Sequence, residues 1–176
     1  MTETPAELDV LMARLADGDR AAFTPVFRAL WAPTVRFCRT MTNNEADAAD
    51  AAQMAMQKIL ERANEYEPKR AAMPWALAIA GWECRTLARK RSRRRETPEG
   101  EGPEPALESA EEVLEQRDLV RAALDALGKL SPEDQEALIA TFTEEAASVG
   151  GATLRKRRQR ALERLKNAFR RLYGLD

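Results

Sequence analysis

The sequence predicts an all-α protein made of two small helical domains joined by an acidic, flexible linker. Apolar residues recur at the helical period along almost every periodic stretch, and no stretch shows the alternation and β-branched enrichment of a strand. The composition changes abruptly after Arg95, where prolines, glycines and glutamates crowd together. At 176 residues the chain has room for two such domains, each with a thin core. We place the domains at residues 1–95 and 112–176, with the linker at 96–111.

The first domain is expected to contain four helices. Asp17-Gly18-Asp19 ends the first and caps the second, Asn43-Asn44 opens the third, and Pro74 suits the first position of the fourth. The expected helices cover residues 6–16, 19 to about 41, 45–63, and 74 onward into a basic segment at 85–95.

The second domain is expected to contain three helices. An amphipathic helix covers residues 113–127 and ends at Gly128. Ser131 caps the next helix and is followed by Pro132, which is tolerated in a first turn. Thr153 caps the last helix, which has a leucine stripe on one side and arginines elsewhere.

Charge is distributed in blocks along the chain. Residues 85–95 hold seven cations and no acids, 96–118 hold nine acids and one cation, and 153–176 hold nine cations and two acids. The formal net charge of −1 hides this layout. Dense cation clusters attract polyanions by releasing condensed counterions. The sequence therefore predicts two modules that face nucleic acid, joined by an anionic tether.

Several function classes are disfavoured by composition. The chain has no histidine, which removes the commonest general base and the commonest metal ligand. Cys38 and Cys84 lie in apolar helical patterns without CxxC spacing, which favours buried, reduced thiols and a cytoplasmic location. The N-terminus is acidic and no apolar run is long enough for a bilayer, so we expect neither export nor membrane insertion.

The first domain resembles region two of small sigma-70 family factors of the extracytoplasmic-function type, which have only sigma regions two and four. Gly18-Asp19-Arg20-Ala21-Ala22-Phe23 is similar to the entry motif of that family. Ala46-Asp47-Ala48-Ala49-Asp50-Ala51-Ala52-Gln53 is similar to its acidic polymerase-docking helix. Trp75-Ala76-Leu77-Ala78-Ile79-Ala80, followed by Arg89-Lys90-Arg91, resembles the helix that meets the −10 promoter element.

The second domain resembles region four of the same factors. Leu130 to Leu138 is similar to the opening helix, and Ala152 to Leu162 is similar to the recognition helix. Segment 143–152 is shorter than the family pattern, so we expect a shortened or remodelled helix-turn-helix in which Glu144-Glu145-Ala146-Ala147 is a remnant of the supporting helix. A second departure lies in the −10 helix, where Trp82 and Thr86 stand at places that often hold Asn and Asp.

The resemblance implies that one helix face docks on core RNA polymerase. An exposed acidic face is ordinary in itself, but one that is poor in cations suits the basic clamp helices of the largest polymerase subunit. The residues expected on this face are Asp47, Asp50, Gln53 and Gln57.

The resemblance also implies two promoter-binding surfaces. The free-energy cost of opening a duplex is offset when the protein stacks the bases on aromatic rings and holds the strand with cations. Trp75 is expected in the core. For Tyr66 an ordinary surface position and a role in base stacking both stay open, and Trp82 is undecided. The residues expected at the −10 element are Tyr66, Lys69, Arg70, Trp82, Arg85 and Arg89. The residues expected at the −35 element are Thr153, Arg155, Lys156, Arg158 and Gln159.

The favoured interpretation is a promoter-specificity subunit that works with core polymerase, through its clamp helices and flap, and with promoter DNA. Such factors are commonly held by an anti-sigma partner, and their linkers thread the RNA exit channel. We expect no covalent chemistry, catalytic residue, metal or cofactor. One alternative is an architectural DNA binder that acts without polymerase. A metal-dependent phosphoryl-transfer enzyme built on Asp47 and Asp50 is a weaker one, because no third ligand has plausible spacing.

Overall fold

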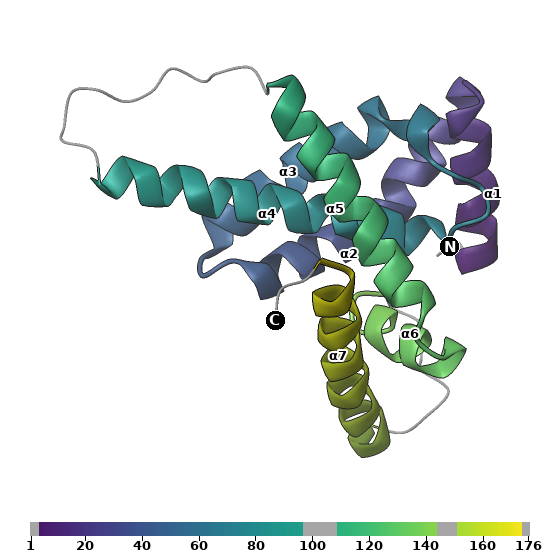
Figure 1. Cartoon of the computed structure of the whole chain (residues 1–176). Helices are drawn as coiled ribbons and strands as arrows, with labels where there is room; N and C mark the ends of the chain where they lie inside the picture. The colour runs from purple at the N-terminus through teal and green to yellow at the C-terminus, as the bar shows by residue number, and fades with distance from the viewer. Residues whose placement is uncertain (1–3, 97–108, 144–150, 174–176) are drawn as a thin grey trace. The chain divides into compact units, whose positions relative to one another are not determined.

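The computed structural model describes residues 4–96, 109–143 and 151–173, and every regular element in these ranges is helical (Figure 1). The predicted all-α class is therefore confirmed. The chain divides into two compact units, residues 1–118 and 119–176. The elements in chain order are α1 (Pro5–Ala16), η1 (Arg20–Ala22), α2 (Phe23–Met41), α3 (Glu45–Glu61), η2 (Ala63–Glu65), α4 (Ala72–Glu96), α5 (Ala110–Gly128), α6 (Pro132–Ile139) and α7 (Gly151–Tyr173).

Side-chain caps set the starts of several helices. Thr4 and Glu7 form a reciprocal capping box at α1, and Asp19 accepts a hydrogen bond from the backbone N–H of Ala21 at the start of η1. Asn44 Oδ1 accepts from the N–H of Asp47 at 2.8 Å and starts α3. Ser131 caps α6, as the sequence predicts.

Several helices begin slightly earlier in the chain than the sequence predicts; α5, for example, begins at Ala110 and not at residue 113. The helix expected to begin at Pro74 begins at Ala72, because Asp9 Oδ1 accepts a hydrogen bond from the N–H of Ala72 at 2.7 Å and holds the preceding turn. Thr153 does not cap the last helix, since α7 already begins at Gly151.

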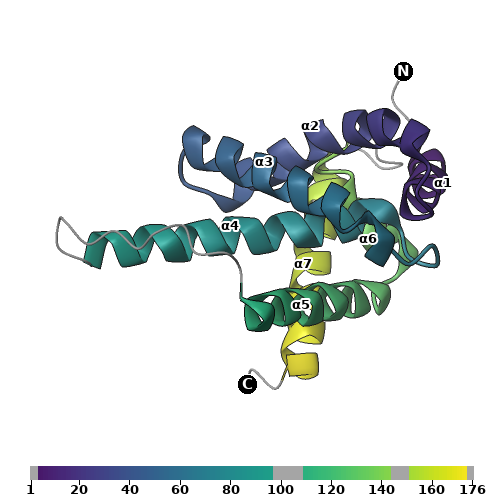
Figure 2. The same cartoon turned by 90° about the horizontal axis from the view of Figure 1, so that it is seen from above.

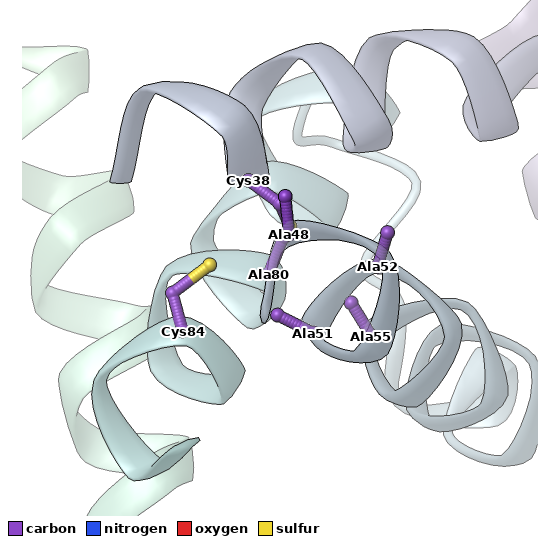
Figure 3. Packing of buried hydrophobic residues seen from close by; sticks show 7 residues of the cluster. All are labelled: Cys38, Ala48, Ala51, Ala52, Ala55, Ala80 and Cys84. Carbon is purple, nitrogen blue, oxygen red and sulfur yellow. The ribbon is translucent and has the colours of Figure 1, made fainter. Parts of the chain in front are cut away.

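The core of the first unit is built from small side chains on α2, α3 and α4. Alanines dominate the buried face of α3 and allow the three helices to approach closely. Figure 3 shows the cluster, which consists of Cys38, Ala48, Ala51, Ala52, Ala55, Ala80 and Cys84. Larger side chains such as Trp31 and Leu87 pack around it.

The two cysteines are buried and free, as predicted. They come from α2 and α4 and lie in the same cluster. A hydrogen bond with Cys84, assisted by burial, raises the pKa of the Cys38 thiol above its ordinary value. Both thiols therefore contribute to packing between α2 and α4.

The first turns of α5 belong to the first unit. Gln116 is 1% exposed; its amide nitrogen donates to Glu83 Oε1 at 3.1 Å, and its amide oxygen accepts from the guanidinium of Arg62. Next to it, Arg117 pairs with Glu65 at 2.6 Å. These bonds explain why the first unit extends to residue 118, beyond the segment 96–111 that the sequence assigns to the linker.

The second unit has a small core of its own. Leu130, Leu138 and Ala161 are buried together, and Leu127 and Leu165 pack against them. An ion pair joins Asp134 at the start of α6 to Arg164 on α7. The predicted remnant at Glu144–Ala147 lies outside the described residues. None of the helices described, in either unit, is both long enough and apolar enough to cross a membrane.

Candidate nucleic-acid interface

The outer face of α3 carries three of the four predicted docking residues. Asp50, Gln53 and Gln57 are exposed, at spacings of three and four that keep them on one face. Gln57 donates to Glu61 at 2.7 Å, so the polar face continues to the last turn of the helix. Alanines fill the opposite face and bury it in the core. The exposed part of this surface is thus an acidic and amide-bearing ridge.

Asp47 differs from the other three predicted docking residues. Its side chain is only 14% exposed, and its carboxylate forms an ion pair with Arg91 of α4. The Oδ1 atom that faces Arg91 is itself buried. Asp47 therefore joins α3 to the basic end of α4, and its carboxylate is engaged within the first unit.

The loop between α3 and α4 is held by Tyr66. The Tyr66 hydroxyl donates to the carbonyl oxygen of Arg70 at 2.5 Å, and its ring meets Trp75 edge-on with the ring centroids 5.6 Å apart. Tyr66 is 4% exposed, and burial raises its pKa to about 12. The ring is therefore committed to the loop, and it is neither an ordinary surface ring nor displayed for stacking on bases.

The second aromatic expected at the −10 surface is also buried. Trp82 is 8% exposed on α4, and the core position predicted for Trp75 is confirmed at 6% exposed. Exposed aromatic rings do occur in the first unit, but on α2, where Phe23 is 47% and Phe27 is 37% exposed. Sequence reasoning missed them because both fit the helical apolar pattern of a buried stripe.

The cations expected at the −10 surface are accessible but spread out. Lys69, Arg85 and Arg89 are exposed, whereas Arg70 is half-buried and pairs with Glu67 at 3.4 Å. Arg85 lies more than three turns beyond the start of α4 at Ala72. Along a helix axis that separation is about 20 Å. The loop cations and the helix cations therefore form two separate clusters, and one nucleotide cannot contact both.

Several residues that shape this region were not predicted. Asp9 caps α4, Glu83 is fully buried under α5, and Arg62 connects both Glu65 and Gln116. The contacts of Asp9 with Ala72, of Glu83 with Gln116 and of Arg62 with Gln116 join residues that are far apart in the chain, and no local spacing in the sequence marks them. The pair of Arg62 with Glu65 has a local spacing of three.

The five residues expected at the −35 element are all exposed on α7: Thr153, Arg155, Lys156, Arg158 and Gln159. Thr153 and Lys156 line a groove of about 480 Å³ between the starts of α6 and α7, together with Arg157 and Arg160. Asp134 borders the same groove, but its carboxylate is paired with Arg164. The groove side of α7 and its outer side both present cations.

Among the comparisons with known proteins, a match to a family model concerns the first unit. Residues 27–94 match the family model of Sigma-70 region 2, and the match lies wholly within the first unit. This match confirms the predicted resemblance of the first unit to region two of sigma-70 factors. No curated protein matches the chain. The chain is similar to a solved structure, that of CnrH in complex with the cytosolic domain of CnrY, with a TM-score of 0.46 and 19% identity over 96% of this chain and 97% of that chain.

Proposed function

We propose that the protein is a sigma factor of the extracytoplasmic-function type, which binds core RNA polymerase in the cytoplasm and directs transcription from specific promoters. The observation that carries this proposal is the Sigma-70 region 2 match, which covers α3 with its exposed acidic ridge and α4 with its exposed arginines. The first unit then docks on polymerase and opens the −10 element. The second unit, through α7, addresses the −35 element.

The docking role falls to Asp50, Gln53 and Gln57. Their side chains are exposed on a face of α3 that the core does not use, and a carboxylate ridge is complementary to a basic coiled coil such as the clamp helices. Such charge complementarity guides association and fixes register.

Asp50→Arg tests this role. Placing a cation in the ridge should weaken binding to purified core polymerase by more than about tenfold, because like charges then face each other. The measurement is a titration of labelled protein with core enzyme. Asp17→Arg makes the same charge change at an exposed residue after α1 and should leave the affinity unchanged. Equal affinity of Asp50→Arg and the native chain would remove the docking role.

Run-off transcription tests the function as a whole. Purified protein is added to core polymerase on a library of genomic fragments, and discrete transcripts are expected that core enzyme alone does not make. Loss of every such transcript, together with failure to copurify with core enzyme, would favour the alternative of an architectural DNA binder. Within the described parts of both units no three His, Cys, Asp or Glu side chains are placed to hold a metal ion, so those residues offer no support for the phosphoryl-transfer alternative.

An anti-sigma partner is part of the same proposal and rests on the family resemblance.

The acidic linker is proposed to thread the RNA exit channel, where carboxylates imitate an RNA backbone. Replacing its glutamates with glutamines keeps the length and removes the charge, so a fall in run-off yield would assign the effect to charge.

A further inference from the structure

We propose that Asp47 is a positioning residue for promoter opening and that docking on polymerase does not depend on it. In this proposal, which rests on the sigma-factor function above, its carboxylate holds Arg91 and so fixes the rotation and the helical order of the basic end of α4. Asp47 and Asp50, one turn apart on α3, then serve two different steps.

The ion pair is well placed to act as a fixed anchor. Asp47 lies in the first turn of α3, where its backbone N–H is held by Asn44 at 2.8 Å. Its side chain is 14% exposed, whereas that of Arg91 is 38% exposed. A partly buried pair is less screened by salt than a surface pair. The anchored partner is therefore Asp47, and the residue that it restrains is Arg91.

The end of α4 needs such an anchor. Leu87 is the last apolar residue of the helix that packs against the core cluster of the first unit. Six of the seven residues from 89 to 95 are cations, and none is acidic. Like charges three or four residues apart destabilise a helix. A carboxylate supplied by the neighbouring helix α3 offsets part of this repulsion. In both views the last part of α4 extends past the start of α3 (Figure 1, Figure 2).

The anchor also sets which cations face outward. Successive residues of an α-helix are rotated by about 100°. Arg89 is two residues before Arg91 and therefore lies on roughly the opposite side of the helix, while Arg85, one turn earlier, is aligned with Arg89. With Arg91 held against α3, the other two arginines point away from it. Their exposure agrees with this geometry, since Arg85 and Arg89 are exposed and Arg91 is half-buried.

Hydrogen–deuterium exchange on the free, full-length chain tests the anchor without polymerase. Asp47→Asn should speed exchange of the backbone amides of residues 88–96 by about fivefold, the size expected for loss of a partly buried ion pair. Arg91→Gln should do the same. The charge-swapped double variant Asp47→Arg with Arg91→Asp should restore slow exchange. Arg39→Gln removes a different pair at the start of α3, the one with Glu45 at 2.5 Å, and should leave exchange at 88–96 unchanged.

The functional half of the test separates docking from opening. Asp47→Asn should keep the affinity for core polymerase within about twofold and should reduce permanganate reactivity of −10 thymines, on a promoter fragment identified by run-off transcription, by about fivefold. For Asp50→Arg the main effect should instead be the loss of affinity for core polymerase. The double swap should recover opening, which a merely destabilised chain would not do.

The outcomes are distinguishable. Unchanged exchange at 88–96 in Asp47→Asn overturns the anchor, whatever polymerase does. Loss of core affinity by Asp47→Asn to the same degree as by Asp50→Arg returns Asp47 to the docking surface and overturns the inference. If the native chain does not bind core enzyme at all, the proposed function fails, while the exchange result still decides whether Asp47 orders the end of α4.

Discussion

Tyr66 lies inside the loop between α3 and α4, with its hydroxyl on the carbonyl oxygen of Arg70 and its ring edge-on to Trp75. Burial, followed by the negative charge of Asp9, raises its pKa from 10.0 to about 12. The folded state thus holds the phenolic proton more tightly than the unfolded chain. The resulting stability is fully present below the unfolded pKa and is lost as the pH rises from about 10 to about 12.

Tyr66→Phe tests this coupling. At neutral pH the variant should be less stable by about 1 kcal/mol, because a buried hydrogen bond is lost. Between about pH 10 and 12 the native chain should lose stability that the variant does not, so the two should converge. Urea unfolding followed by tryptophan fluorescence at several pH values measures both effects. Parallel pH profiles for the two proteins would contradict the assignment, since Tyr173 is common to both.

At the level of single residues, the sequence predicted the accessible cations of the −10 surface better than it predicted which aromatic side chains are exposed. Lys69, Arg85 and Arg89 are accessible as expected, whereas Tyr66 and Trp82 are buried. Residue type and local spacing cannot show this, because the loop is fixed by contacts between distant parts of the chain. The N–H of Ala72 meets Asp9 across 63 residues, and Arg62 meets Gln116 across 54.

At the level of elements, capping residues and apolar periodicity predicted the positions of most helices. Asp19, Asn44 and Ser131 start their elements as expected, because an N-cap is a local interaction that the sequence displays directly. The start of α4 was misplaced because its cap, Asp9, lies on α1. The packing of the first turns of α5 within the first unit was likewise not predicted, since it depends on a buried polar network between three elements.

Gln116→Leu tests the docking of α5. The substitution removes both side-chain bonds of Gln116 and takes one donor from the fully buried Glu83. The first unit should therefore lose about 2 kcal/mol of stability. All three tryptophans lie within residues 1–118, so their fluorescence in the full-length chain during a urea titration reports on this unit.

The neighbouring Glu115 supplies the matched control, because its side chain is exposed. Exposed positions away from such networks tolerate substitution, so Glu115→Leu should change the stability by only about 0.5 kcal/mol or less. Coincident unfolding midpoints for the Gln116 and Glu115 variants would show that the network does not hold the first turns of α5 in the first unit.

At the level of the whole molecule, the charge layout of the sequence maps onto the two units. The basic end of α4 belongs to the first unit and α7 belongs to the second, so each unit has its own cationic surface. The net charge of −1 describes neither surface. The sequence could predict this separation because charge blocks are local, whereas the exact division at residue 118 depends on which helix turns bond to which unit.

Arg155→Ala combined with Arg158→Ala tests whether local or net charge controls binding of the full-length chain to duplex DNA. Both arginines are exposed near the start of α7, where side chains reach phosphates and base edges. Removing two phosphate contacts should lower the affinity and reduce the slope of log affinity against log salt by about 1.8, at about 0.9 per contact. Fluorescence anisotropy between about 50 and about 200 mM salt measures the slope.

The control makes an equal change in net charge elsewhere. Arg20 and Arg28 are exposed on η1 and α2, and replacing both with alanine also takes the formal charge from −1 to −3, since −1 minus two cations is −3. If the surface of α7 makes the contacts, this control should keep the native slope, because neither arginine lies on α7 and both phosphate-contacting arginines of α7 are retained. An equal fall in slope for both double variants would mean that binding follows the overall field of the protein, and the assignment of α7 to DNA would then be lost.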